Sequence, residues 1–191
     1  MRKPSIVAVA LASVALAAPA FAHSGLPGHT HGLANGLSHP LGGLDHLLAM
    51  LGVGIWSALM VKGARVLLAP AVFLLAMLAG AGLGIGGAPF PAVETGIALS
   101  VAVLGLLIWG RVTLPALAAA LIIGAFGVLH GYAHGSEATG NAASYMAGFA
   151  LATAMLHLAG IGMGRSLAGF SLAARATGGF LAVAGLGLLV S

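Results

Sequence analysis

The residues best suited to chemistry are histidines and acids in two short motifs. One motif, HGYAHGSE, places His130 and His134 four residues apart, so a helix would carry both imidazoles on one face, one turn apart. Helices use that spacing to bind a metal with two side chains. Glu137 extends the same stripe, and no Glu follows the first His, so this is not the HExxH motif of zinc proteases. Alternatively, the helix ends near His130 and the rest is a loop, which could still form the mouth of a metal site.

The other motif, HPLGGLDHLLAM, contains His39, Asp45 and His46 near the start of an apolar stretch. In a straight helix the two histidines would lie about 10 Å apart along the axis, too far to hold one ion together. The two glycines at 42–43 could permit a bend, or a close helix approach, that shortens this gap. Met50 lies one turn after His46 and offers a thioether. The alternative is a buried His–Asp pair that binds no metal.

The remaining ionisable residues are more ambiguous. Glu94 opens another apolar stretch, where an acid commonly offsets the helix dipole, but its expected depth matches that of the other two acids. His157 lies deep in a later stretch and is either a ligand on the exit side or a histidine bonded to a neighbouring helix. His23, His29 and His31 could capture ions at the mouth, or they belong to a tolerated polar linker.

These residues form a set of nitrogen and oxygen ligands without thiolates, because the chain contains no cysteine. Imidazole suits nickel, cobalt, copper and zinc, and carboxylates add charge balance. The residues alone do not order these metals. Haem held by two histidines is disfavoured by the neighbouring acids.

The composition places these side chains in a membrane. The chain has 191 residues, of which 60% are hydrophobic and 5% charged, and its mean hydropathy is +1.12. A soluble domain carries about 25% charged residues, so lipid must solvate most of this surface. The 31 glycines suit close packing of helices in a bilayer. The net charge is +4, and the basic residues that produce it are scattered along the chain. This pattern does not predict a nucleic-acid partner.

The N-terminus has the pattern of a signal peptide. Arg2 and Lys3 precede an apolar run at 5–18, and Ala-Phe-Ala at 20–22 is a cleavage site, so the mature chain should begin at His23. The alternative is an uncleaved first helix. We predict a signal peptide at 1–22, an exposed, flexible periplasmic histidine-rich arm at 23–38 and an all-α domain of six transmembrane helices at 39–191. The expected spans are about 40–61, 66–86, 92–110, 113–133, 141–162 and 172–190.

Basic residues predict the orientation. If His23 lies outside, the first, third and fifth loops are cytoplasmic. All basic residues after the signal peptide fall in or beside these loops: Lys62, Arg65, Arg111, Arg165 and Arg175. Cytoplasmic loops are enriched in Lys and Arg. The sequence therefore predicts a multi-pass protein of the bacterial inner membrane with both termini in the periplasm.

The two motifs resemble those of the HupE/UreJ family of hydrogenase- and urease-associated membrane proteins. The shared patterns are H-x5-D-H, here His39 to His46, and H-G-x-A-H-G-x-E, here 130–137. A Phe often precedes the second pattern in the family, and Leu129 stands there in this chain, a change that touches packing rather than ligation. The resemblance covers the whole chain and implies uptake of nickel, or cobalt in some branches, into the cytoplasm. It also implies that Glu94 belongs to the functional set.

The predicted function is a permease for divalent nickel or cobalt, the ion being cargo rather than a prosthetic group. The expected metal site, near the outer face, contains His39, Asp45, His46, Glu94, His130, His134 and Glu137, with His23, His29, His31, Met50 and His157 as possible secondary ligands. No GxxxxGK[ST] loop is present, so ATP is not expected to drive transport. The alternative is an intramembrane metal sensor or metalloenzyme without transport. The sequence leaves the metal, the coupling and the oligomeric state open.

Overall fold

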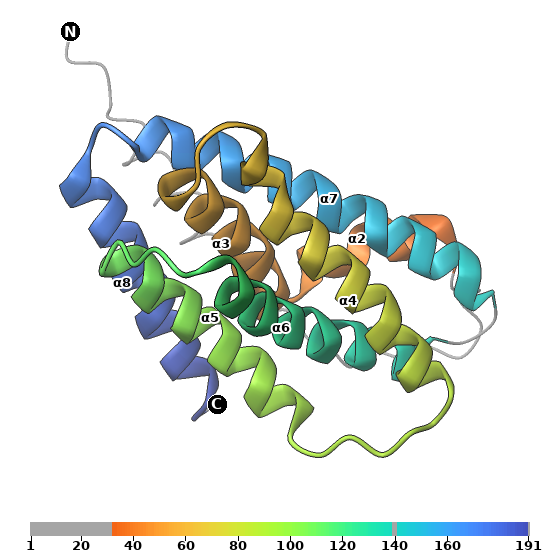
Figure 1. Ribbon diagram of the computed structural model, residues 1–191. Coiled ribbons are helices and arrows are strands. Elements are labelled where there is room, and N and C mark those ends of the chain that lie inside the picture. Colours follow the sequence, from red (N-terminus) through yellow and green to blue (C-terminus); the bar gives the residue numbers. More distant parts are fainter. Residues whose placement is uncertain (1–31, 139–140, 191) are drawn as a thin grey trace, which may run out of the picture.

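The computed structural model describes residues 32–138 and 141–190, and every regular element in these ranges is a helix (Figure 1). The prediction of an all-α protein is confirmed. The elements are α2 (Leu33–Gly42), α3 (Leu44–Met60), the 3-10 helix η1 (Gly63–Leu67), α4 (Leu68–Ile85), α5 (Val93–Trp109), α6 (Ala116–Glu137), α7 (Ala142–Leu167) and α8 (Ser171–Leu188). The expected signal peptide and His23, His29 and His31 lie outside the described residues.

Four helical stretches are long and apolar enough to cross a bilayer, namely Gly63–Ile85, Ala116–Glu137, Ala142–Leu167 and Ser171–Leu188. The pair α2 and α3 makes a fifth candidate if it counts as one broken span. Helix α5 is apolar but shorter, with 17 residues. Each predicted span thus corresponds to a helix or a helix pair, whereas the lengths support four to five crossings rather than six.

The first predicted span differs from the expectation of one helix over 40–61. Helices α2 and α3 meet at 87°, with Gly43 between them in an extended conformation (φ −102°, ψ 118°). Adjacent glycines form the weakest point of a helix because each gives up the most backbone entropy on folding. Residues 33–38, expected as part of a flexible arm, are helical and belong to α2.

Glycine contacts set the distances between the helices. Helix α4 packs against α6, α5 against α8, and both α2 and α3 against α7. In the first pair, an added Cβ on Gly131 would collide with the carbonyl oxygen of Met77, and one on Gly135 with that of Ala81. Small residues at such contacts let helix backbones approach closely. This contact holds the helix of the second histidine motif directly against α4.

Gly131→Ala is expected to destabilise the fold, because its methyl group has no space at the α4–α6 contact. Overpacking typically costs about 1–3 kcal/mol, which corresponds to a fall in Tm of roughly 3–10 °C for a chain of this size. Gly82→Ala is the matched control, since a Cβ there meets nothing within 4 Å. Thermal unfolding in detergent, followed by loss of the monodisperse peak, should separate the two variants. Equal Tm values would contradict the packing argument.

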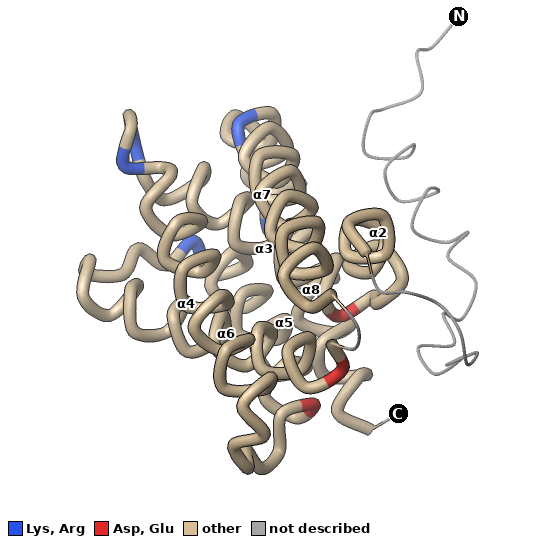
Figure 2. The backbone as a smooth tube through the Cα atoms, turned by 90° about the vertical axis from the view of Figure 1, so that its right-hand side faces the viewer, with Lys and Arg blue, Asp and Glu red and all other residues tan. Residues whose placement is uncertain are grey.

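The surface suits lipid along the helices and water at their ends. Large apolar side chains are widely exposed, including Leu75 at 68%, Leu117 at 72% and Val183 at 71%. Lys and Arg lie toward one end of the helices, and Asp and Glu lie toward the other (Figure 2). This separation arises because Asp45 and Glu94 stand at helix starts and Glu137 at a helix end. The acidic end is also the end that carries both histidine motifs.

Candidate metal centre

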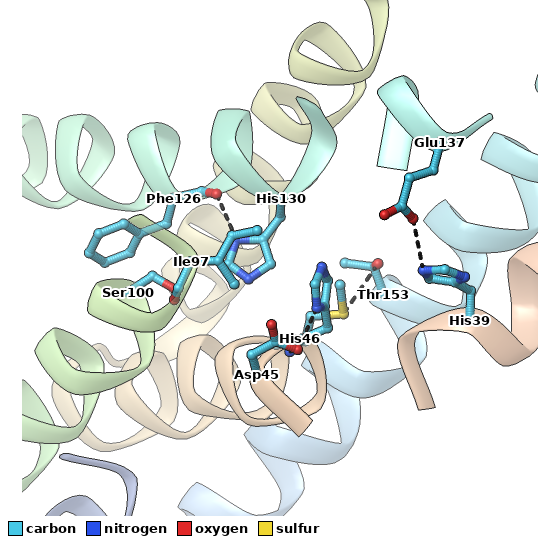
Figure 3. Close-up of polar contacts among 10 residues, drawn as sticks. His39, Asp45, His46, Ile97, Ser100, Phe126, His130, Glu137 and Thr153 are labelled. Atoms are coloured by element: carbon cyan, nitrogen blue, oxygen red, sulfur yellow. Dashed lines mark hydrogen bonds and ion pairs between the residues drawn. The ribbon is translucent and has the colours of Figure 1, made fainter. Parts of the chain in front are cut away.

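Three helices bring four imidazoles together near the acidic end. The ring of His46 on α3 lies 4.4 Å from the ring of His134 and 5.0 Å from that of His130, both on α6, between centroids. The ring of His39 on α2 lies 4.6 Å from that of His134. Figure 3 shows His46 and His130 side by side, with His39 and Glu137 at one flank. We call His39, His46, His130 and His134 the histidine cluster.

The bend at Gly43 makes this cluster possible. His39 and His46 would be about 10 Å apart along a straight helix, but the 87° turn directs both rings onto His134. The bend that the glycine pair was expected to permit is present, and the rings of the two motifs are in contact. Helix α6 continues through Glu137, so His130, His134 and Glu137 share one helix rather than a helix and a loop.

Asp45 fixes the orientation of His46. Its Oδ1 accepts from the backbone N–H of His46 at 2.7 Å and lies 2.6 Å from the Nδ1 of the same residue (Figure 3). An ionised carboxylate only accepts, so Nδ1 carries the proton and Nε2 keeps its lone pair. Carboxylates hold metal-binding histidines in this manner and raise their basicity. This geometry fits an orienting role for Asp45 toward His46, whereas the sequence had suggested Asp45 as a metal ligand itself.

A backbone carbonyl fixes the ring of His130 in the same way. Its Nδ1 lies 2.9 Å from the carbonyl oxygen of Phe126, one turn earlier on α6 (Figure 3). A carbonyl oxygen can only accept, so Nδ1 donates and Nε2 is left with its lone pair. His130 and His46 thus both present an unprotonated Nε2.

Four buried ring nitrogens of the cluster have no hydrogen-bond partner in the described part of the chain. His46 Nε2, His130 Nε2 and both nitrogens of His134 are buried and make no hydrogen bond within the described part of the chain. A buried polar atom without a partner costs about 1–3 kcal/mol, and native structures contain few of them. Four such atoms in ring contact indicate a site built for a ligand that accepts nitrogen lone pairs, which is the property of a metal cation.

A more exposed group lies at the edge of the cluster. Donor atoms of His39, His134 and Glu137 lie within 4.8 Å of one another, and His39 Nε2 is 3.8 Å from Glu137 Oε2. Two donors about 2.1 Å from one ion are at most about 4.2 Å apart, so these side chains would have to move closer together to share a metal. The side chains of His39 and Glu137 are 38% and 54% exposed, which leaves them accessible from outside.

The other predicted site residues lie apart from the cluster. Glu94 is exposed in the first turn of α5, and no contact joins it to the histidine rings in the described residues. Met50 is fully buried, and its sulfur accepts a hydrogen bond from the hydroxyl of Thr153 at 3.4 Å. His157 is also buried, on α7.

Sequence reasoning missed two aromatic residues that pack around the cluster. The ring of Phe149 lies 3.8 Å from that of His134, and the ring of Tyr145 lies 5.7 Å from that of His39. Both belong to α7 and are one turn apart. Their only sequence signal is the aromatic pair at spacing i, i+4, which is equally typical of an ordinary core.

Gly43→Ala is expected to disturb the metal site, because the new methyl carbon would lie 2.8 Å from Asp45 Oδ1 and 3.0 Å from His46 Nδ1. The carboxylate would have to move, and it would no longer hold the imidazole. Metal affinity should fall by about 10-fold or more, as for loss of an outer partner of a ligand. Gly42→Ala is the control, with nothing within 4 Å of its Cβ. Equilibrium dialysis with Ni²⁺ measures both, and equal affinities would contradict the assigned role of Asp45.

The fold and the site together define a class, that of helical membrane proteins with a largely buried histidine cluster near one end. The chain matches the family model described as HupE / UreJ protein over residues 10–188. It is also similar to the protein HupE of Rhizobium leguminosarum bv. viciae, with 44% identity over 192 residues, 98% of this chain and 99% of that relative. This chain belongs to the HupE/UreJ family and is a multi-pass membrane protein. No solved structure was found to match it.

Proposed function

We propose that this protein is a permease that carries Ni²⁺, or alternatively Co²⁺, from the periplasm to the cytoplasm through the histidine cluster. The observation that carries the proposal is the group of buried ring nitrogens without partners on His46, His130 and His134. Imidazole binds both metals well. Membership of the HupE/UreJ family supports a role in the supply of these metals.

The proposed order of binding follows the exposure of the side chains. His39 and Glu137 are exposed and would take up the hydrated ion first. His134 belongs to both groups, since it shares donor atoms with the exposed pair and contacts the ring of His46. An ion could therefore pass inward by exchanging one imidazole at a time, without losing all its ligands at once.

Charge at the acidic end supports the same direction of movement. Asp45, Glu94 and Glu137 are the three acids of the chain, and they lie toward one end of the helices (Figure 2). Acids around a mouth raise the local concentration of cations, which gives Glu94 a role without direct ligation. A membrane potential that is negative inside favours entry of a dication by about 4.6 kcal/mol per 100 mV, twice the value for one charge.

Uptake into metal-free proteoliposomes tests the proposal. With an inside-negative potential, wild-type protein should accumulate Ni²⁺ or Co²⁺ in preference to Zn²⁺, and liposomes carrying His134→Ala at equal protein content should not. A fluorescent chelator inside the liposomes reports the metal. Absence of uptake by the wild type rejects the permease, and equal uptake by the variant rejects the route through the histidine cluster.

The proposed topology places the histidine cluster at the periplasmic end of the helices and the basic residues at the cytoplasmic end. Ser136 and Ser166 form a matched pair, since both are exposed and both hydroxyls bond to a carbonyl of their own helix. In right-side-out vesicles, Ser136→Cys should react with an impermeant thiol reagent, and Ser166→Cys should react only after permeabilisation. The chain has no cysteine of its own to give a background. The reverse labelling pattern would invert the topology.

A further inference from the structure

One buried imidazole nitrogen without a partner lies outside the histidine cluster. His157 is 2% exposed, and its Nε2 makes no hydrogen bond in the described part of the chain. The sequence left open a bond from this histidine to a neighbouring helix, and no such bond reaches Nε2. A polar atom in this state, in the middle of a long helix, usually serves a function.

A single aromatic ring connects His157 to the cluster. The ring of Phe73 lies 5.3 Å from that of His130 and 5.1 Å from that of His157, between centroids. Phe73 is fully buried. The phenyl ring, which offers no ligand atom, therefore contacts both imidazoles and links His157 to the cluster.

Two methionine sulfurs lie close to the helix faces that carry Phe73 and His157. The hydroxyl of Thr153 is 3.4 Å from the sulfur of Met50 and 3.7 Å from the sulfur of Met77. Thr153 is one turn from His157 on α7, and Met77 is one turn from Phe73 on α4, so each pair shares a helix face. Thioether and imidazole together suit soft or borderline metals such as nickel, cobalt and copper.

We propose that His157 is a second, internal binding position for the transported metal ion, and that Phe73 is the barrier the ion passes to reach it. The inference rests on the proposed function and adds a route inward from the histidine cluster. Few ligands and no nearby carboxylate would make binding at His157 weak. A transit position needs this property, because an ion must leave as readily as it arrives.

Cobalt–thiolate absorption can detect an ion at this position. The chain has no cysteine, so His157→Cys supplies a single thiol, and a Co²⁺–thiolate bond gives a charge-transfer band in the near ultraviolet. The purified variant in detergent should show this band when Co²⁺ is added. Ala174→Cys is the control, because Ala174 is fully buried on α8, away from the histidines, and should give no band. If the His157→Cys variant shows no band although its histidine cluster binds cobalt as in the wild type, the proposal is overturned.

Phe73 is tested by the rate at which the band appears. In stopped-flow mixing, Phe73→Ala combined with His157→Cys should bring the band up faster by about threefold or more, since the side chain that must swing aside is gone. Phe73→Leu provides a second variant that preserves more of the packing. An unchanged rate in a folded variant removes Phe73 as the barrier.

Transport and binding measured together separate this inference from the proposed function. His157→Ser should lower Co²⁺ uptake by about tenfold or more while affinity at the histidine cluster stays within about twofold of wild type. Wild-type uptake by His157→Ser, or by His157→Asn where the serine variant fails to fold, overturns the second position alone. Absence of uptake by the wild-type protein would instead reject the permease itself.

Discussion

His134→Ala is expected to lower Ni²⁺ uptake by about 100-fold or more, the largest effect of any single substitution in this protein. His134 contacts the rings of both His39 and His46, and its donor atoms complete the group with Glu137. Its loss would remove the side chain that links the exposed pair, His39 and Glu137, to the buried rings of His46 and His130. Ni²⁺ binding measured by equilibrium dialysis and Ni²⁺ uptake measured in liposomes should therefore be lost together.

Combination with a second substitution tests whether the two motifs make one site. His46→Ala and His130→Ala should each cost nearly as much as His134→Ala, because three imidazoles in ring contact act as a unit. Residues that act as a unit are strongly non-additive, so the double variants should lose little more than the single ones. Multiplicative losses would instead show that the motifs serve separate sites.

Tyr132→Phe is the control for this series. Tyr132 lies on α6 between His130 and His134, and its hydroxyl donates to the carbonyl of Ala88 at 2.7 Å. The substitution removes one hydrogen bond, worth about 1 kcal/mol, and leaves every imidazole in place. Uptake near the wild-type value is expected. A loss as large as that of His134→Ala would mean that packing of α6 alone explains the series.

The helical fold could be predicted from the sequence because length and hydropathy determine it. Apolar stretches broken by Gly, Pro and charged residues gave the bounds of α4 to α8 to within a few residues. From the sequence, the 87° break between α2 and α3 was one of several possible conformations of this segment. Two adjacent glycines permit a helix, a bend or a close contact, and the packing of α2 on α7 decides among them.

The site could be predicted as a set of residues but not as an arrangement. Spacing on one helix put His130 and His134 on a common face, whereas the ring contacts to His46 depend on how α3 and α6 meet. The inferred role of Asp45 depends on one rotamer, which directs its Oδ1 to the ring and the backbone N–H of His46. The packing of Phe149 on His134 depends on α7, which no local pattern links to either motif.

Asp45→Asn is expected to weaken Ni²⁺ binding by about 10- to 100-fold, the usual range for loss of a carboxylate that supports a metal-bound histidine. The amide keeps the size of the side chain but has no charge, and its NH₂ group can turn toward Nδ1 of His46. The imidazole would then carry its proton on Nε2, the atom that should bind the metal. On this explanation the metal affinity falls because His46 binds less well, and not because Asp45 itself is lost as a ligand.

A double-mutant cycle distinguishes a positioning role from direct ligation. If Asp45 acts only through His46, then Asp45→Asn should have little further effect in a protein that already carries His46→Ala. The reason is physical, since Asp45 Oδ1 has its 2.6 Å contact with the imidazole that the second substitution removes. Co²⁺ affinities of the wild type, both single variants and the double variant give the coupling. A full, independent loss from Asp45→Asn in the His46→Ala background would mean that the carboxylate binds the metal directly.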